Sequence, residues 1–270
     1  MDLGLADATV CVLGGSKGIG RATAECFAAE GARVVVLGRE RPALDDTVNA
    51  LRRLGSPDSF AMSVDAADGQ QIEAAFDVIR ARWNDLNALI CAVGPPVSHQ
   101  AWDAVTDAQF IDAFVVGALS AVRCARSALP MLRAAQWARI VNISAMSSRC
   151  QGRGLVDYSA AKSALTSMTK NLSLELGAEG ILANTVSPGA IMSDQLTRDL
   201  AAVPAEYGLT ADDPESVMRY ISEKFGVRSD LGRAGLPGEI GAVICFLASQ
   251  RNSYMTGANV NVDSGSAFFA

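Results

Sequence analysis

The sequence predicts an α/β fold in which one parallel sheet is covered by helices on both faces. Short apolar segments rich in β-branched residues alternate with amphipathic segments of helical period. A glycine-rich turn at residues 14–20 follows the first predicted strand and opens the first predicted helix. The 270 residues suit one large domain, and no linker, repeat or low-complexity tract divides them. Together these observations predict a Rossmann-like, doubly wound sheet in a single domain spanning residues 1–270.

Each predicted element follows from its own residues. Strands are expected where β-branched, apolar runs are bounded by turn residues: 8–13, 33–37, 60–64, 88–93, 139–143, 182–186 and 259–262. Helices are expected where apolar residues recur at helical spacing: 19–30, 42–54, 72–83, 110–132, 158–177 and 239–249. Gly31 is a natural end for the first of these helices.

The stretch from Ser193 to Leu231 departs from this alternation. It is polar, helix-prone and too long for a simple connection, so we expect a substrate lid at about 193–231. Met192, Met218, Phe225 and Trp102 either line an apolar substrate pocket or pack the lid on the core.

Bulk composition bounds the function classes. The net charge of -6 argues against nucleic acid or an anionic membrane as the main partner. The six cysteines form no CxxC pair, so we expect neither a zinc site nor a disulfide framework, and a reduced, cytoplasmic protein. The first residues lack a basic leader region, and we expect no apolar run as long as a membrane span.

The glycine turn reads Gly14-Gly15-Ser16-Lys17-Gly18-Ile19-Gly20. Gly14 permits a sharp turn, Gly18 lets the backbone approach a pyrophosphate, and Gly20 lets helix and sheet pack closely. The free N–H groups and partial positive charge of the helix N-terminus favour a phosphate there. The motif therefore predicts dinucleotide binding, and its alternative is an ordinary turn between a strand and a helix.

The end of the second strand indicates which dinucleotide binds. An acidic residue there would bind the ribose 2′-hydroxyl of NAD, but this chain has Gly38 followed by Arg39. Arg39 and Lys17 together suit a 2′-phosphate, so NADP is expected over NAD. The alternative is two solvated surface cations. Asp65, after the third strand, either accepts a hydrogen bond from the adenine amine or caps the next helix.

Tyr158 and Lys162 are candidates for acid/base catalysis. At positions i and i+4 they share one face of a predicted helix. An ammonium beside a phenol favours the phenolate, so we expect the Tyr158 pKa to fall toward neutrality. Tyr158 would then exchange a proton with a developing alkoxide. An ordinary amphipathic helix is the alternative for this pair taken alone.

These motifs, in this order, resemble the short-chain dehydrogenase/reductase family over essentially the whole chain. The glycine turn is similar to that family's TGxxxGIG, with Leu13 in place of the threonine. Residues 184–189, 255–257 and 262–265 resemble its later signatures. The resemblance implies a Rossmann-type fold and NAD(P) chemistry. It also implies that Gly94, Pro188 and Gly189 border the cofactor and that Ile191 and Ser193 meet the nicotinamide carboxamide.

The chain departs from the family around the expected active site. Ala145 stands where the family carries a catalytic serine, thirteen residues before the tyrosine, with Ser144, Ser147 and Ser148 nearby. Gly117 aligns with the family's asparagine that steadies the lysine and a water. The family's NNAG after the fourth strand is here Cys91-Ala92-Val93-Gly94. Only the Tyr158–Lys162 half of the tetrad is intact, and Ser144 or Ser147 is expected to replace the missing donor.

The function expected from these residues is NADP(H)-dependent hydride transfer between nicotinamide and a ketone or secondary alcohol. One rival is a non-redox enzyme on the same scaffold, an isomerase, dehydratase or cyclase. The other is a catalytically silent binding subunit.

We also expect a homodimer or homotetramer, because the helices at 110–132 and 158–177 carry apolar or small residues around much of their circumference. These are Ala118, Ala121, Val122, Ala125, Leu165, Met168, Leu172 and Leu176.

Overall fold

A computed structural model of the chain contains one seven-stranded parallel sheet with the order β3-β2-β1-β4-β5-β6-β7. The structure describes residues 2–150, 152–193, 196–197, 200 and 208–266. The strands are β1 (Thr9–Leu13), β2 (Arg33–Gly38), β3 (Ser59–Ser63), β4 (Ala88–Cys91), β5 (Ala138–Ile143), β6 (Ile181–Pro188) and β7 (Asn259–Val262). The predicted Rossmann-like, doubly wound sheet is confirmed, and every predicted strand is present within a few residues of its expected ends.

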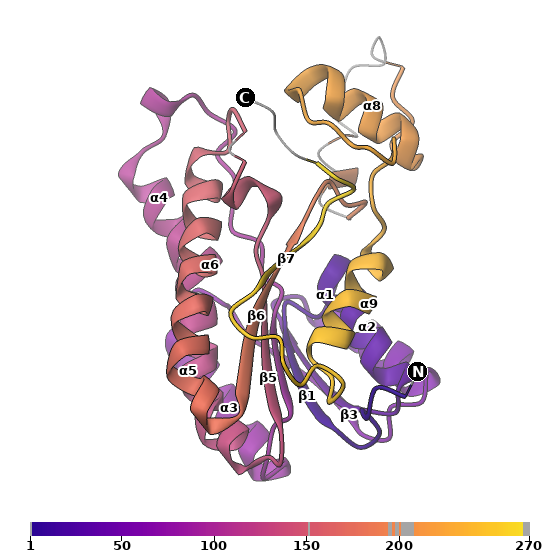
Figure 1. The fold of residues 1–270 in the computed structure, drawn as a ribbon, viewed down its shortest axis with the longest axis vertical. Helices are drawn as coiled ribbons and strands as arrows, with labels where there is room; N and C mark the ends of the chain where they lie inside the picture. The colour runs from indigo at the N-terminus through magenta and orange to yellow at the C-terminus, as the bar shows by residue number, and fades with distance from the viewer. Residues whose placement is uncertain (1, 151, 194–195, 198–199, 201–207, 267–270) are drawn as a thin grey trace.

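Helices cover both faces of this sheet (Figure 1). One face carries α1 (Gly18–Ala29), α2 (Arg41–Arg53) and α9 (Pro237–Leu247), and the other carries α3 (Gly69–Arg82), α5 (Ser120–Ala134) and α6 (Val156–Leu176). The helix α4 (Asp107–Phe114) packs on α6, and α8 (Pro214–Phe225) stands beyond the end of the sheet. Short helical turns lie at Trp102–Ala104, Met146–Ser148 and Gly177–Glu179.

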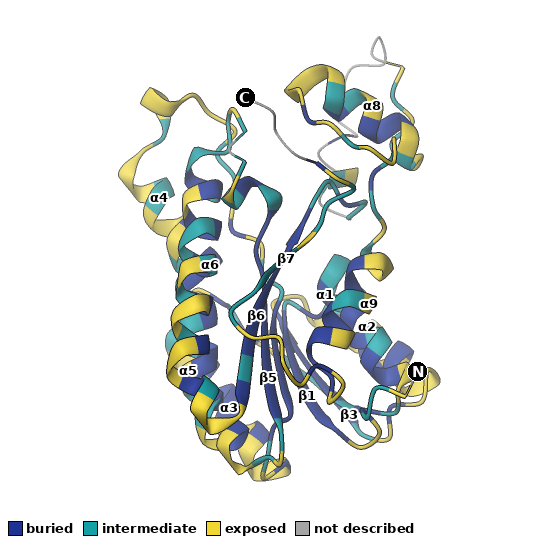
Figure 2. Cartoon of the chain, viewed as in Figure 1, coloured by how far each residue is buried: buried dark blue, intermediate teal, exposed yellow. Residues whose placement is uncertain are grey.

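The inner strands from β2 to β6 in the sheet order are largely buried because helices cover both of their faces, as the dark blue of these strands in Figure 2 shows, whereas the edge strands β3 and β7 are mostly intermediate. Alternate side chains of β1 enter opposite cores: Cys11 and Leu13 join one apolar cluster, whereas Val10 and Val12 join the other. This arrangement explains why the strands are continuous apolar runs in the sequence rather than alternating ones.

Strand order reverses between β1 and β4, which pair directly. Open α/β sheets bind ligands outside the carboxyl ends of their strands at such a switch point. The turn after β1 and the loop after β4 touch there, since a Cβ on Gly14 would lie 2.8 Å from the Ala92 carbonyl oxygen. Gly14 itself has a φ of 80°, a backbone conformation that favours glycine.

Part of the predicted lid forms a small helical unit at the carboxyl edge of the sheet. Asp213 caps α8 by accepting hydrogen bonds from the N–H groups of Glu215 and Ser216. The unit has its own apolar cluster, in which Met218 is buried and Met192 partly buried, whereas Phe225 and Trp102 are exposed. Positions 194–195, 198–199 and 201–207 of the predicted lid lie outside the described residues.

The helix predicted at 110–132 is a longer run with a change in its middle. Thr106 and Gln109 form a capping box that starts α4 at Asp107, and a π-helical turn, η2 (Val115–Leu119), separates α4 from α5. By length and composition alone, residues 107–134 could cross a membrane, so the expectation of no such run is wrong. In this fold the run packs on α3, α6 and the sheet.

The residues on which the assembly prediction relied lie mostly inside the subunit. Ala118, Ala121, Ala125, Leu165 and Leu176 belong to a core cluster, and Met168 and Leu172 pack against it. Their apolar character is therefore explained without a partner. Apolar side chains that do reach the surface of these helices are Ile111, Phe114 and Leu174, of which Leu174 is 68% exposed.

Candidate active site

The fold brings the predicted site residues to one edge of the sheet. The glycine turn follows β1, Arg39 follows β2, Asp65 follows β3 and Gly94 follows β4. Residues 144–148 follow β5, and residues 189–193 follow β6. Because parallel strands end at the same edge, segments far apart in the sequence meet there.

The glycine turn packs closely against the start of α1. A Cβ on Gly20 would lie 2.1 Å from the Gly14 carbonyl oxygen, so the first turn of α1 packs directly on the turn before it. Gly18 has a φ of 53°, and a Cβ placed there would lie 3.7 Å from the Ser193 Cβ, at ordinary van der Waals distance. The glycine turn and the segment after β6 therefore lie close together at the carboxyl edge of the sheet.

The two cations expected to select NADP differ in their surroundings. Arg39 is exposed, whereas Lys17 Nζ lies 2.6 Å from Glu40 Oε2. Glu40 is a site residue that the sequence reasoning missed, although it directly follows Arg39. Gly38 is buried, and a Cβ there would lie 3.1 Å from Ser16 Oγ, so this position has little room for a carboxylate side chain.

Other predicted cofactor residues take up defined positions. Asp65 Oδ1 accepts a hydrogen bond from the Ala67 N–H at 2.9 Å, and the helix α3 is capped by Asp68 instead. The suggestion that Asp65 caps this helix is therefore wrong.

The segment after β6 is closely packed. A Cβ on Gly189 would lie 2.9 Å from the Asp263 Cα, and Ile191 is buried and pairs with Gly235 in an isolated bridge. Ser193 accepts a hydrogen bond from the Leu196 N–H through its hydroxyl. Gly94 is exposed, and a Cβ there would meet nothing within 4 Å.

Lys162 connects α6 to the ends of β4 and β5. Its ammonium donates hydrogen bonds to the carbonyl oxygens of Val93 at 3.0 Å and Ile143 at 2.7 Å. The side chain is only 1% exposed. Tyr158, one turn earlier on the same helix, is partly buried, and no described residue forms a hydrogen bond with its hydroxyl. The Lys162 ammonium therefore lies at the carboxyl edge of the sheet, and Tyr158 precedes this residue by one helical turn.

Burial dominates the ionisation of this pair. It raises the pKa of Tyr158 to about 12 and lowers the pKa of Lys162 to about 8, the latter effect being partly opposed by Cys91. The expectation that Lys162 lowers the Tyr158 pKa is wrong for this structure. The physical reason is that the ammonium is directed at two main-chain oxygens, while the phenolate would be desolvated.

The two serines expected to replace the family donor differ sharply. Ser144 Oγ lies 3.0 Å from the Lys162 carbonyl oxygen and 2.8 Å from Thr166 Oγ1, so it is engaged by α6. Ser147 is buried, and its hydroxyl has no hydrogen-bond partner among the described residues. A buried hydroxyl without a partner is costly, so Ser147 is the better candidate for a ligand contact.

Asp157 is a further residue that sequence reasoning missed. Its buried carboxylate accepts hydrogen bonds from the Ser98 N–H at 3.2 Å and hydroxyl at 3.1 Å, and from the Tyr158 N–H at 2.9 Å. It ties the loop after β4 to the start of α6. An acidic residue in the first turn of a helix is a weak signal for such a role.

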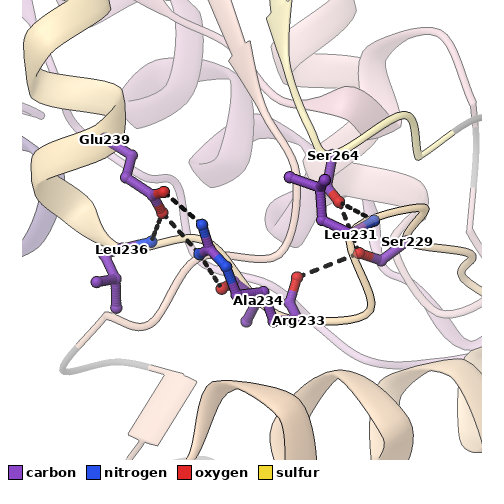
Figure 3. Close-up of polar contacts among 7 residues, drawn as sticks. All are labelled: Ser229, Leu231, Arg233, Ala234, Leu236, Glu239 and Ser264. Atoms are coloured by element: carbon purple, nitrogen blue, oxygen red, sulfur yellow. Dashed lines mark hydrogen bonds and ion pairs between the residues drawn. The ribbon is translucent and has the colours of Figure 1, made fainter.

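Polar contacts also anchor the segment that joins the lid to α9 (Figure 3). Arg233 pairs with Glu239 at 2.6 Å, and this pairing, with a hydrogen bond from the Leu236 N–H, lowers the Glu239 pKa to about 2. Ser264 Oγ lies 2.7 Å from Ser229 Oγ and accepts a hydrogen bond from the Leu231 N–H. A cavity of about 90 Å³ lies between these groups and Gly189.

Comparisons with known proteins place the chain in a family. Residues 14–267 match the family model described as enoyl-(acyl carrier protein) reductase. The short-chain reductase protein NovJ of Streptomyces niveus is 30% identical over 96% of this chain and 94% of its own length. The 3-oxoacyl-[acyl-carrier-protein] reductase FabG of Chlamydia trachomatis is 29% identical over 97% of this chain and 98% of its own length.

Solved structures share the fold. The L-sorbose reductase of Gluconobacter frateurii, solved with NADPH and L-sorbose, superposes with a TM-score of 0.90 over 100% of both chains at 23% identity. The relatives support an oxidoreductase. On the matching model and these relatives, the chain belongs to the short-chain dehydrogenase/reductase family.

Proposed function

We propose that this protein is an NADP(H)-dependent oxidoreductase that interconverts a ketone and a secondary alcohol. The observation that carries the proposal is the position of Tyr158 and Lys162. Lys162 reaches the ends of β4 and β5, at the same edge of the sheet as the glycine turn that would hold the pyrophosphate. An acid, its neighbouring cation and a dinucleotide site thus share one edge of the sheet.

Tyr158 acts as the proton donor in the reductive direction. A bound nicotinamide supplies a hydride to the carbonyl carbon in reduction and accepts one from the alcohol in oxidation. Tyr158 transfers its phenolic proton to the carbonyl oxygen, so that the ketone becomes an alcohol, and it recovers a proton from solvent. Burial raises the pKa of Tyr158, so the phenol carries its proton at neutral pH and is available as the donor in the reductive direction.

Other residues hold the reactants. The glycine turn from Gly14 to Gly20 would hold the pyrophosphate, and Arg39 with Lys17 would hold a 2′-phosphate. Lys162 would bind the nicotinamide ribose, and Ile191 with Ser193 the carboxamide. Ser147 would donate a hydrogen bond to the substrate carbonyl, because its buried hydroxyl lacks a partner among the described residues.

The relatives support a carbonyl substrate and a phosphorylated cofactor. The sorbose reductase was solved with NADPH, and the relatives named above are reductases. A trihydroxynaphthalene reductase of Pestalotiopsis fici, 31% identical over 97% of this chain, is another. Ile191 and Met218 line the cavity of about 90 Å³ beside Gly189, which favours a substrate with an apolar part.

The test is NADPH consumption with a panel of ketones, quinones and acyl thioesters. We expect turnover by the native protein and its loss in Tyr158→Phe, with NADPH binding nearly unchanged, because the hydroxyl contributes mainly in the transition state. Tyr254→Phe is the matched control, since Tyr254 is fully exposed. Tight NADPH binding without consumption of any carbonyl would contradict the proposal and favour a non-redox or binding role.

A further inference from the structure

The ammonium of Lys162 is held by main-chain atoms. Both of its acceptors within the described chain are carbonyl oxygens, of Val93 on the loop after β4 and of Ile143 on β5. An ammonium that is 1% exposed needs such acceptors, because an unpaired buried charge is costly. The positions of the Val93 and Ile143 carbonyls therefore decide together where the ammonium lies.

Pro95 lies two residues beyond Val93 on the same loop and is buried. A Cβ placed on Gly117 would lie 2.8 Å from Pro95 Cγ and 3.0 Å from Pro95 Cβ. The same Cβ would lie 3.1 Å from the Cβ of Ala161, the residue before Lys162. The proline ring thus occupies the space into which a side chain at position 117 would extend.

The backbone around Gly117 supports this pairing. Gly117 stands at the centre of the π-helical turn Val115–Leu119, between α4 and α5. Glycine inside a helix costs about 1 kcal/mol relative to alanine, and π-helical turns are frequent at functional sites. The close contact with Pro95 explains why glycine stands here.

Proline also stiffens the loop. Its ring fixes its own φ, and each proline restricts the residue before it, so Pro95 and Pro96 constrain residues 94–96. We propose that Pro95 is a positioning residue: seated on Gly117, it holds the Val93 carbonyl oxygen on the Lys162 ammonium. Gly117 has no polar side chain that could hold Lys162. In this protein the Val93 carbonyl, held in place by Pro95, does so instead.

This inference rests on the proposed function only in that Lys162 belongs to the proposed catalytic pair. If Pro95 acts through Lys162, a substitution of Pro95 should weaken NADPH binding only while Lys162 is present. If the role of Pro95 is merely structural, its substitution should weaken NADPH binding equally with and without Lys162.

The test is a double-mutant cycle with NADPH dissociation constants from fluorescence titration, which needs no turnover. We expect Pro95→Ala to weaken binding roughly three- to tenfold, and to add less than about twofold in a Lys162→Met background. Gly117→Ala places a methyl group against the Pro95 ring and should weaken NADPH binding in the same way. This variant replaces Pro95→Ala in the cycle if Pro95→Ala fails to fold. Pro96→Ala, at an exposed neighbour, is the control and should change binding by less than about twofold.

Two further measurements complete the cycle. Gly117→Ala should lower the Tm by about 4 °C or more through overpacking, and Pro95→Ala should relieve much of this loss in the double variant. With a reducible carbonyl, Pro95→Ala should lower kcat and leave the substrate KM nearly unchanged. An equal effect of Pro95→Ala on NADPH binding in both backgrounds, or none in either, would overturn the inference. NADPH binding without any turnover would count against the proposed function while this cycle still decides the role of Pro95.

Discussion

Lys17 and Glu40 form an ion pair at the edge of the expected cofactor site, with Nζ and Oε2 2.6 Å apart. One residue comes from the glycine turn and the other from the segment between β2 and α2. A 2′-phosphate bound here would meet a cation that already has a carboxylate partner. The preference for NADPH therefore depends on the balance between Arg39, Lys17 and Glu40.

We expect tighter binding of NADPH than of NADH. Arg39→Ala should shrink the difference by roughly 1–3 kcal/mol, the scale of a hydrogen bond to a charged group. Titration of both cofactors measures it, and Arg41→Ala, which removes the same charge from a residue paired with Asp45, is the control. Equal or tighter NADH binding by the native protein would refute the preference.

Glu40→Gln should strengthen NADPH binding about two- to fivefold and leave NADH binding nearly unchanged. The substitution removes a negative charge from beside Lys17, and the gain should fade at high salt because both side chains are partly exposed. Glu25→Gln is a matched control, since Glu25 pairs with Arg21 on α1, the helix that follows the glycine turn. Weaker NADPH binding in Glu40→Gln would show that the carboxylate instead helps to orient Lys17.

The stability of the cofactor-free protein should carry the signature of Lys162. Its pKa is lowered from 10.5 to about 8 by burial, so between these pH values the unfolded chain binds the proton more tightly than the folded one. Burial of the charged Lys162 therefore lowers the free energy of unfolding by its full amount below pH 8. This loss of stability decreases as the pH rises toward 10.5. Urea unfolding of the native protein and Lys162→Met should diverge across this window by roughly 1–3 kcal/mol. Parallel pH profiles would mean that Lys162 is hydrated.

The serine that donates to the substrate can be identified by exchange. Ser147→Ala should lower kcat on the order of 100-fold, the low end for losing a donor to a developing oxyanion. Ser144→Ala should chiefly lower stability, because that hydroxyl contacts the Lys162 carbonyl and Thr166. Ala145→Ser should raise or preserve turnover if the carbonyl lies at the family position. A larger loss of kcat in Ser144→Ala than in Ser147→Ala would reverse the assignment.

Assembly as a homodimer or homotetramer remains a prediction, now carried by different residues. Ile111, Phe114 and Leu174 are apolar and exposed on α4 and α6. Light scattering at micromolar concentration should report an oligomer, and Leu174→Glu should weaken it if this surface is buried between subunits. A native monomer would refute the prediction.

The sequence predicted the sheet because β-branched runs and amphipathic segments alternate clearly enough to read each element separately. The glycine turn and the Tyr158–Lys162 pair could also be recognised from the sequence, because each lies within a single turn or helix. Both β-branched runs and helical spacing are properties of neighbouring residues, so no tertiary information is needed to see them.

Contacts between segments far apart in the chain were decided only by the tertiary structure. The pairing of Lys17 with Glu40, the seat of Pro95 on Gly117, and the partners of Lys162 all join residues from different elements. The direction of the Tyr158 pKa shift belongs here as well. The sequence places Lys162 one helical turn from Tyr158. Whether burial or this cation dominates the Tyr158 pKa depends on where the ammonium points.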